Sequence, residues 1–140
     1  PEVYGPEQEF VIGKAITLRE GTDAAIISIG DTVHIALEAA EELLRQGIKA
    51  RVLDMHTIKP LDVEAVTKAV NECGKIVTVE DHNIINGLGS AVASVAADMG
   101  HGVVKRIGIL DRFGQSAPYE RLLEMNGITV ENIVSIVKGI

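Results

Sequence analysis

The sequence predicts an α/β fold, a three-layer α/β/α sandwich in which a mostly parallel sheet lies between two layers of helices. Short apolar runs alternate with amphipathic stretches along most of the chain, which is typical of βαβ units with right-handed crossovers. Hydrophobic residues make up 46% of the chain but aromatic residues only 3%. The core must therefore be packed from Ile, Val, Leu and Ala, the usual composition of a buried parallel sheet.

Hydrophobic periodicity and turn residues indicate the individual elements. The expected strands are Phe10 to Arg19, Ala24 to Ile29, Lys49 to Met55, Lys75 to Glu80 and Val103 to Leu110, of which the first alternates least regularly. The expected helices run from about Val33 until Gly47, from Asp62 until Gly74, from Leu88 to Met99, from Pro118 to Asn126, and from Thr129 through Val137. Gly30-Asp31-Thr32, Asp62 and Thr129 are expected to cap their helices, and Pro118 suits a first turn.

The chain of 140 residues suits one compact domain. Residues 1–9 contain two prolines and indicate an extended tether or linker, which leaves 10–140 as the domain. The tether is either the cut end of a longer polypeptide or a native terminus that has lost its initiator Met.

Charge, cysteine content and hydropathy exclude several classes of function. A net charge of −7 without a basic stripe argues against binding nucleic acid. The single cysteine, Cys73, permits no internal disulfide and indicates a reducing, cytoplasmic setting. No apolar run approaches the roughly 18 residues of a membrane span.

Four of the apolar runs end in a polar cluster, and these clusters indicate where function is located. They are Gly30-Asp31-Thr32, Asp54-Met55-His56, Glu80-Asp81-His82-Asn83 and Asp111-Arg112-Phe113. If the runs are parallel strands, all four clusters lie at the carboxyl edge of one sheet, where open α/β folds bind ligands.

Glu80 and His82 are two residues apart, so they share one face if the strand continues through them. A carboxylate beside an imidazole can tune a proton donor or hold a metal, and His56 joins them if its strand is adjacent. The alternative, which we favour, is a network of hydrogen bonds at an interface.

Gly87-Leu88-Gly89 opens a helix after a strand, which invites comparison with a dinucleotide-binding loop. However, the third glycine of G-x-G-x-x-G would fall at Val92, and the first lies too far beyond the strand. We therefore expect these glycines to serve a tight helix entry.

Arg112 is the strongest anion-binding group expected at the edge, and Lys59 is the second. The alternative is that Asp111 and Arg112 order the loop while Phe113 is buried in a neighbouring domain or subunit, which suits an exposed aromatic residue at a sheet edge. The residues by themselves form no complete catalytic set, so we predict no catalytic, cofactor-binding or metal-binding residue in this chain.

Several motifs together resemble the C-terminal domain of transketolases, most closely those found as two shorter chains. The motifs span residues 54–60, 79–83, 87–90, 106–108 and 111–116. The resemblance implies a five-stranded mixed sheet whose first strand is antiparallel to the others. This sequence departs from the family at Ala117, where a glycine is usual, so the role of that loop is open.

The resemblance also implies the reaction. Transketolases transfer a two-carbon ketol unit from a ketose phosphate to an aldose phosphate, using thiamine diphosphate held by a divalent metal such as Mg²⁺. In that family other domains bind the diphosphate and the pyrimidine ring, while the C-terminal domain supports the dimer and the approach to the active site. The residues then expected at the interface or active-site approach are His56, Glu80, His82, Gly87, Gly89, Asp111, Arg112 and Phe113.

The expected partners are the diphosphate-binding and pyrimidine-binding domains of the same enzyme, within a homodimer of the complete enzyme, with sugar phosphates as substrates. The isolated domain is expected to be inactive. Related modules occur in 2-oxo acid dehydrogenase beta subunits and deoxyxylulose-phosphate synthases, so both remain alternatives. A third hypothesis is a stand-alone protein that binds phosphate or a metal at His56, Glu80, His82 and Arg112.

Overall fold

The computed structural model describes residues 3–83, 87–109 and 118–140, and at positions 82 and 83 it describes the backbone. Five strands form one sheet in the order β1-β3-β2-β4-β5, with β1 antiparallel to β3 and the other neighbours parallel. The predicted mixed sheet is therefore confirmed. Its strands are β1 (Ile16–Arg19), β2 (Ala24–Ser28), β3 (Ala50–Asp54), β4 (Lys75–Asn83) and β5 (Val103–Ile109).

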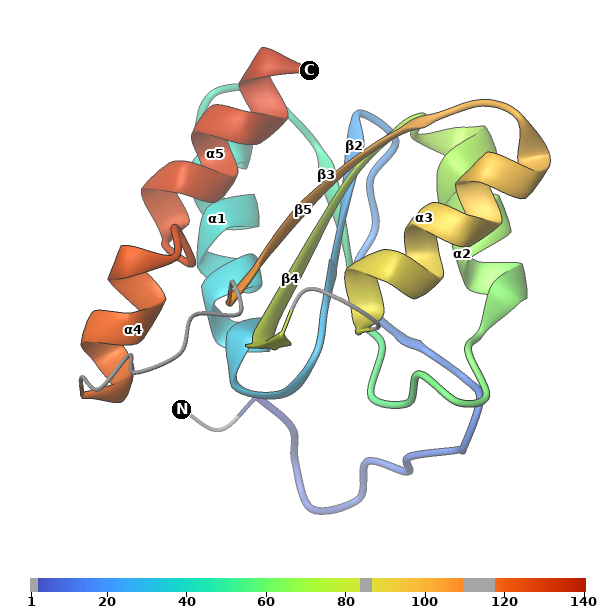
Figure 1. The fold of residues 1–140 in the computed structure, drawn as a ribbon, viewed down its shortest axis with the longest axis horizontal. Helices are drawn as coiled ribbons and strands as arrows, with labels where there is room; N and C mark the ends of the chain where they lie inside the picture. The colour runs from blue at the N-terminus through green and yellow to red at the C-terminus, as the bar shows by residue number, and fades with distance from the viewer. Residues whose placement is uncertain (1–2, 84–86, 110–117) are drawn as a thin grey trace.

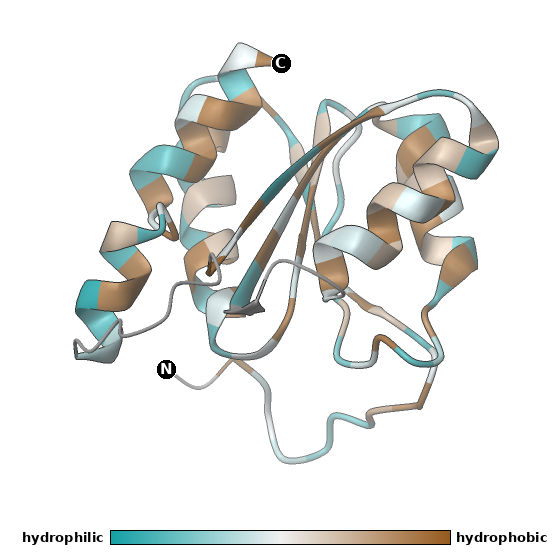
Figure 2. Ribbon diagram, viewed as in Figure 1, coloured by the Kyte–Doolittle hydropathy of each residue, from teal (hydrophilic) through white to brown (hydrophobic). Residues whose placement is uncertain are grey.

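Helices cover both faces of the sheet and complete the predicted three-layer sandwich (Figure 1). They are α1 (Val33–Arg45), α2 (Val63–Glu72), α3 (Leu88–Met99), α4 (Tyr119–Met125) and α5 (Val130–Gly139). One core cluster packs Ile26 and Val52 against α1 and α5, and a second packs Ile27 and Leu53 against α2 and α3. Neighbouring strand residues point to opposite faces, so β2 and β3 are buried along their whole length. Figure 2 shows the apolar faces of the helices turned toward the sheet.

The segment between residues 3 and 15, here called the strap, forms no strand, so the predicted start of the first strand at Phe10 is wrong. A tight turn at Val11–Lys14, closed by the Lys14 N–H on the Val11 carbonyl at 3.0 Å, breaks the extended chain. Gly13 occupies that turn with φ of 81°, a conformation that favours glycine. The strap runs across the carboxyl ends of the strands before β1 begins (Figure 1).

Two of the three predicted helix caps are confirmed. The Asp62 carboxylate accepts a hydrogen bond from the Ala65 N–H at 3.0 Å, and the Thr129 hydroxyl accepts one from the Asn132 N–H at 3.1 Å. Thr32 does not cap α1 through its side chain. Residues Gly30–Thr32 instead form a short 3₁₀ helix, and the Thr32 hydroxyl turns inward.

The link between β1 and β2 crosses the amino end of β3, because β3 lies between those two strands in the sheet. Gly21 makes this crossing. A Cβ atom there would lie 2.5 Å from the Lys49 carbonyl oxygen and 2.7 Å from the Arg51 backbone nitrogen. The two backbone segments therefore approach each other more closely than any side chain allows.

Among the described residues, no helix is long and apolar enough to span a membrane.

Candidate functional site at the carboxyl edge

The register of the sheet brings three of the four predicted polar clusters to one edge. Asp54 of β3 is level with Ser28 of β2, and Ser28 is level with Val79 of β4. Because these strands are parallel, the residues that follow each of them emerge on the same side. The fourth cluster, Asp111-Arg112-Phe113, lies outside the described residues, as does the side chain of His82.

Glu80 is fully buried and binds the amino end of α3. Its Oε1 accepts a hydrogen bond from the Leu88 N–H at 2.9 Å, and its Oε2 accepts one from the Gly89 N–H at 2.7 Å. The first N–H groups of a helix have no partner within the helix and favour a negative charge. The Glu80 carboxylate therefore lies where a bound phosphate lies in a nucleotide-binding loop.

The predicted tight helix entry at Gly87 and Gly89 agrees with this geometry. Gly87 is the N-cap residue of α3 and has an extended backbone. A Cβ atom on Gly89 would lie 2.9 Å from the Thr78 hydroxyl oxygen and equally close to the Arg106 side chain. Gly89 thus permits the close packing of α3 on β4 and β5, while Glu80 supplies the anion.

His56 does not join Glu80, because β2 lies between their strands. The condition under which His56 was expected to join Glu80, adjacent strands, is therefore not met. His56 Nε2 instead lies 2.7 Å from the Lys14 carbonyl oxygen, and its ring meets the edge of Phe10 at 5.3 Å between centroids. His56 therefore holds the strap against the loop that follows β3.

Two tyrosines bind carboxylates at the same edge, a feature that the sequence analysis missed. The Tyr4 hydroxyl, on the strap, donates to Asp54 Oδ2 at 2.6 Å. The Tyr119 hydroxyl, at the start of α4, donates to Asp81 Oδ2 at 2.7 Å. Each bond joins residues far apart in the chain, so no local sequence pattern indicated it. The two bonds fasten the strap and α4 to the sheet.

These contacts predict a fall in stability at alkaline pH. Burial and the neighbouring aspartate raise the pKa of Tyr4 and of Tyr119 above the ordinary value of 10.0. Each neutral phenol thus contributes stability that is complete below pH 10 and is lost as the pH rises further, since the unfolded chain ionises first. The Tyr4→Phe/Tyr119→Phe variant should lose less stability than the parent between about pH 8 and about pH 11. Urea unfolding at several pH values measures this, and equal losses would contradict the prediction.

The connection after β2 leads to α1 on one face, whereas the connection after β4 leads to α3 on the other (Figure 1). Open α/β sheets bind ligands in the crevice at such a switch point. Here Thr32 is fully buried, and its Oγ1 lies 2.7 Å from the Ile29 carbonyl oxygen and 3.0 Å from the Val79 carbonyl oxygen. Thr32 therefore bridges the ends of β2 and β4 at the position where a ligand would enter.

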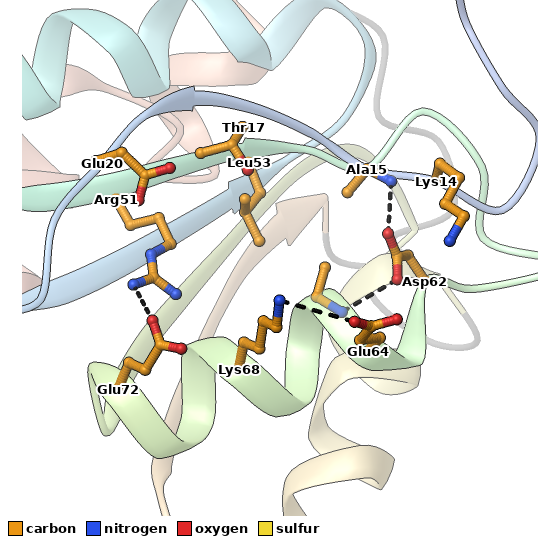
Figure 3. A pocket seen from close by; sticks show the side chains of 11 residues that line it. Lys14, Ala15, Thr17, Glu20, Arg51, Leu53, Asp62, Glu64, Lys68 and Glu72 are labelled. Carbon is orange, nitrogen blue, oxygen red and sulfur yellow. Dashed lines mark hydrogen bonds and ion pairs between the residues drawn. The ribbon is translucent and has the colours of Figure 1, made fainter.

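A polar pocket of about 330 Å³ lies between β1, β3 and α2 (Figure 3). Arg51 Nη2 pairs with Glu72 at 2.7 Å, and Lys68 Nζ lies 3.7 Å from Glu64. The Asp62 carboxylate accepts hydrogen bonds from two backbone N–H groups. Most charges in this pocket are thus matched by others in it, and none of the predicted site residues lines it.

The described residues do not fit a site for thiamine diphosphate or its metal. Among them, no three His, Cys, Asp or Glu side chains are grouped in a way that would hold a metal ion. The Leu88 and Gly89 N–H groups, which open α3, already bind Glu80.

Comparison with known proteins identifies the family to which this chain belongs. Residues 13–133 match the family described as transketolase, C-terminal domain. The chain belongs to the transketolase C-terminal domain family. The resemblance expected from the sequence motifs is thereby confirmed.

A solved structure titled as a split gene transketolase, an inactive beta4 tetramer, has the same fold as this transketolase C-terminal domain. It superimposes with a TM-score of 0.92 at 40% identity, over 99% of this chain and 46% of that chain. A 6-deoxy-6-sulfo-D-fructose transketolase subunit from Clostridium sp. (strain MSTE9) is 44% identical over 126 residues, which is 90% of this chain and 39% of that protein.

A 1-deoxy-D-xylulose-5-phosphate synthase from Thermomicrobium roseum (strain ATCC 27502 / DSM 5159 / P-2) is 42% identical over 134 residues. That match covers 95% of this chain and 21% of that protein. The transketolase C-terminal domain described here thus spans less than half the length of each of these relatives.

Proposed function

We propose that this domain is the C-terminal part of a thiamine-diphosphate-dependent transketolase that transfers a two-carbon ketol unit from a ketose phosphate to an aldose phosphate. The observation that carries the proposal is the likeness to transketolase subunits, at 40% identity over 99% of the chain for the solved structure. The named transketolase relative acts on a 6-deoxy-6-sulfo-ketose, so the substrate class extends to ketoses with an anionic group.

In this proposal the domain works as a scaffold, and the polar groups named below form hydrogen bonds within the domain. Glu80 binds α3, Thr32 bridges the ends of β2 and β4, and His56 holds the strap. Thiamine diphosphate and Mg²⁺ are held by the diphosphate-binding and pyrimidine-binding domains and supply the chemistry of carbon–carbon cleavage there. The carboxyl edge, with Asp111, Arg112, Phe113 and His82, faces those domains and the approach of substrate, within a homodimer of the complete cytoplasmic enzyme.

Reconstitution tests the proposal. The chain alone should show no ketol transfer, and the complete assembly with thiamine diphosphate and Mg²⁺ should transfer a two-carbon unit between sugar phosphates. Coupled assays with a panel of ketose phosphates and their 6-sulfo analogues measure the rate. A complete assembly that is saturated with cofactor and acts on none of these ketoses would overturn the proposal.

The 42% identity to a deoxyxylulose-phosphate synthase favours that activity as a second candidate. The same assembly separates the two activities by its product. Formation of 1-deoxy-D-xylulose 5-phosphate in place of ketol transfer would establish the second candidate and reject the first.

A further inference from the structure

Three consecutive large apolar residues of the strap are exposed, and we call them the apolar strip. The exposed fraction is 52% for Phe10, 53% for Val11 and 74% for Ile12. The domain covers none of the three fully. Contiguous exposed apolar residues of this kind mark interaction surfaces.

The strip is tied to the domain by several contacts although it has no regular secondary structure. Ile12 lies in the tight turn that Lys14 closes, and the Gly13 N–H donates to the Thr57 hydroxyl at 3.0 Å. The Phe10 ring packs edge-on against Tyr4 and His56. Ile12 itself is 74% exposed, so its side chain is presented outward. A rigid apolar anchor loses little conformational entropy when a partner covers it.

We propose that the apolar strip is the docking surface for the part of the subunit that precedes this domain in the longer relatives, which would meet it with an apolar surface. This inference rests on the proposed function. The family is a C-terminal domain, and the chain spans 39% and 46% of two transketolase relatives, so most of their remaining length precedes it. The strip lies on the strap, which precedes β1 in the chain, so it is on the side of the domain that a preceding part of the subunit would join.

The charges beside the strip argue against a second copy of this domain as the occupant. Glu7 and Glu9 are exposed next to Phe10, and the chain carries a net charge of −7. A two-fold interface places the same patch on both partners, so these carboxylates would face their own copies. A different partner avoids this repulsion, and we expect basic residues around its apolar centre.

Limited proteolysis tests the proposal, because chymotrypsin cleaves after Phe10. The isolated chain should be cleaved there. The complete subunit should be cleaved at least about tenfold more slowly, because a docked state favoured tenfold over the open state covers the site for most of the time. In the complete subunit, Ile12→Ser should bring the cleavage rate back toward that of the isolated chain. Val103→Ser, which alters an exposed valine at the opposite edge of the sheet, should leave the protection intact.

A control on the isolated chain separates docking from local unfolding. Ile12→Ser should leave its cleavage rate and its urea midpoint unchanged, because Ile12 is mostly exposed. Equal cleavage of the isolated chain and the complete subunit would overturn the proposal, as would protection that survives Ile12→Ser. Dimers of the isolated chain that Ile12→Ser dissociates would also overturn it, in favour of a second copy.

The readouts also separate this inference from the proposed function. A complete enzyme that transfers ketol units but leaves the strip open to chymotrypsin would reject the docking surface alone. A complete subunit that protects the strip yet acts on no ketose would reject the proposed reaction while retaining the docking surface.

Discussion

Gly21→Ala is expected to be among the most damaging single substitutions in the described part of the domain, lowering the free energy of unfolding by about 3 kcal/mol. The new methyl group would meet Lys49 O, Ala50 C and Arg51 N at 2.5 to 2.7 Å. All three are backbone atoms at the start of a central strand, so no side chain can rotate away. The link across β3 must therefore move, together with the hydrogen bond from the Asp23 N–H to the Lys49 carbonyl.

Gly139→Ala is the matched control. Gly139 ends α5, its φ is not positive, and a Cβ there meets nothing within 4 Å. Alanine is a better helix former than glycine, so this variant should be unchanged or more stable by up to about 1 kcal/mol. Urea unfolding followed by circular dichroism measures both variants. Similar stabilities for the two would show that the crossing at Gly21 relaxes without cost.

Glu80→Gln is expected to destabilise the domain by about 2 to 4 kcal/mol, although the side chain keeps its shape. The carboxylate accepts bonds from two N–H groups with both of its oxygens. The amide retains only one oxygen acceptor. Its NH₂ group would face the second backbone N–H, so two hydrogen-bond donors would point at each other in a fully buried site. The favourable interaction of a negative charge with the amino end of α3 is also lost.

Glu64→Gln provides the comparison for this charge effect. Glu64 lies in the first turn of α2 with 72% of its side chain exposed and only a 3.7 Å pairing with Lys68. Its removal should therefore change the free energy of unfolding by less than about 1 kcal/mol. Hydrogen exchange of the α3 amides should quicken in Glu80→Gln and not in Glu64→Gln. If α3 exchanged at the parent rate in both variants, Glu80 would not be the group that stabilises this helix.

Local signals allowed the sequence to predict most of the fold. The bounds of α3 agree with the predicted Leu88 to Met99, because apolar periodicity and the flanking glycines act within the helix itself. The caps at Asp62 and Thr129 depend on a neighbour three residues away, and both were found. The first strand was placed too early because the alternation from Phe10 ignored the turn that Gly13 permits.

The candidate site was harder to predict because its contacts join distant parts of the chain. Periodicity carries no information on strand order, so it cannot show that β2 lies between the strands that lead to His56 and Glu80. The Tyr4–Asp54 and Tyr119–Asp81 bonds span 50 and 38 positions, which no local pattern encodes. Thr32 does occupy the N-cap position of α1, which threonine favours, but its hydroxyl contacts the carbonyls of Ile29 and Val79 and caps no helix N–H.

The order of the strands also constrains how this chain can fold. The three strands in the middle of the sheet, β2, β3 and β4, follow one another along the chain, joined by α1 and α2. A compact intermediate can thus form from neighbouring units before either border strand is added, which keeps the early loop closures short. Mutational analysis of the folding kinetics compares the change in activation free energy of folding with the change in stability. We expect this ratio to be high for substitutions in β2 and β3, which should slow folding, and low for those in β1 and β5, which should mainly accelerate unfolding.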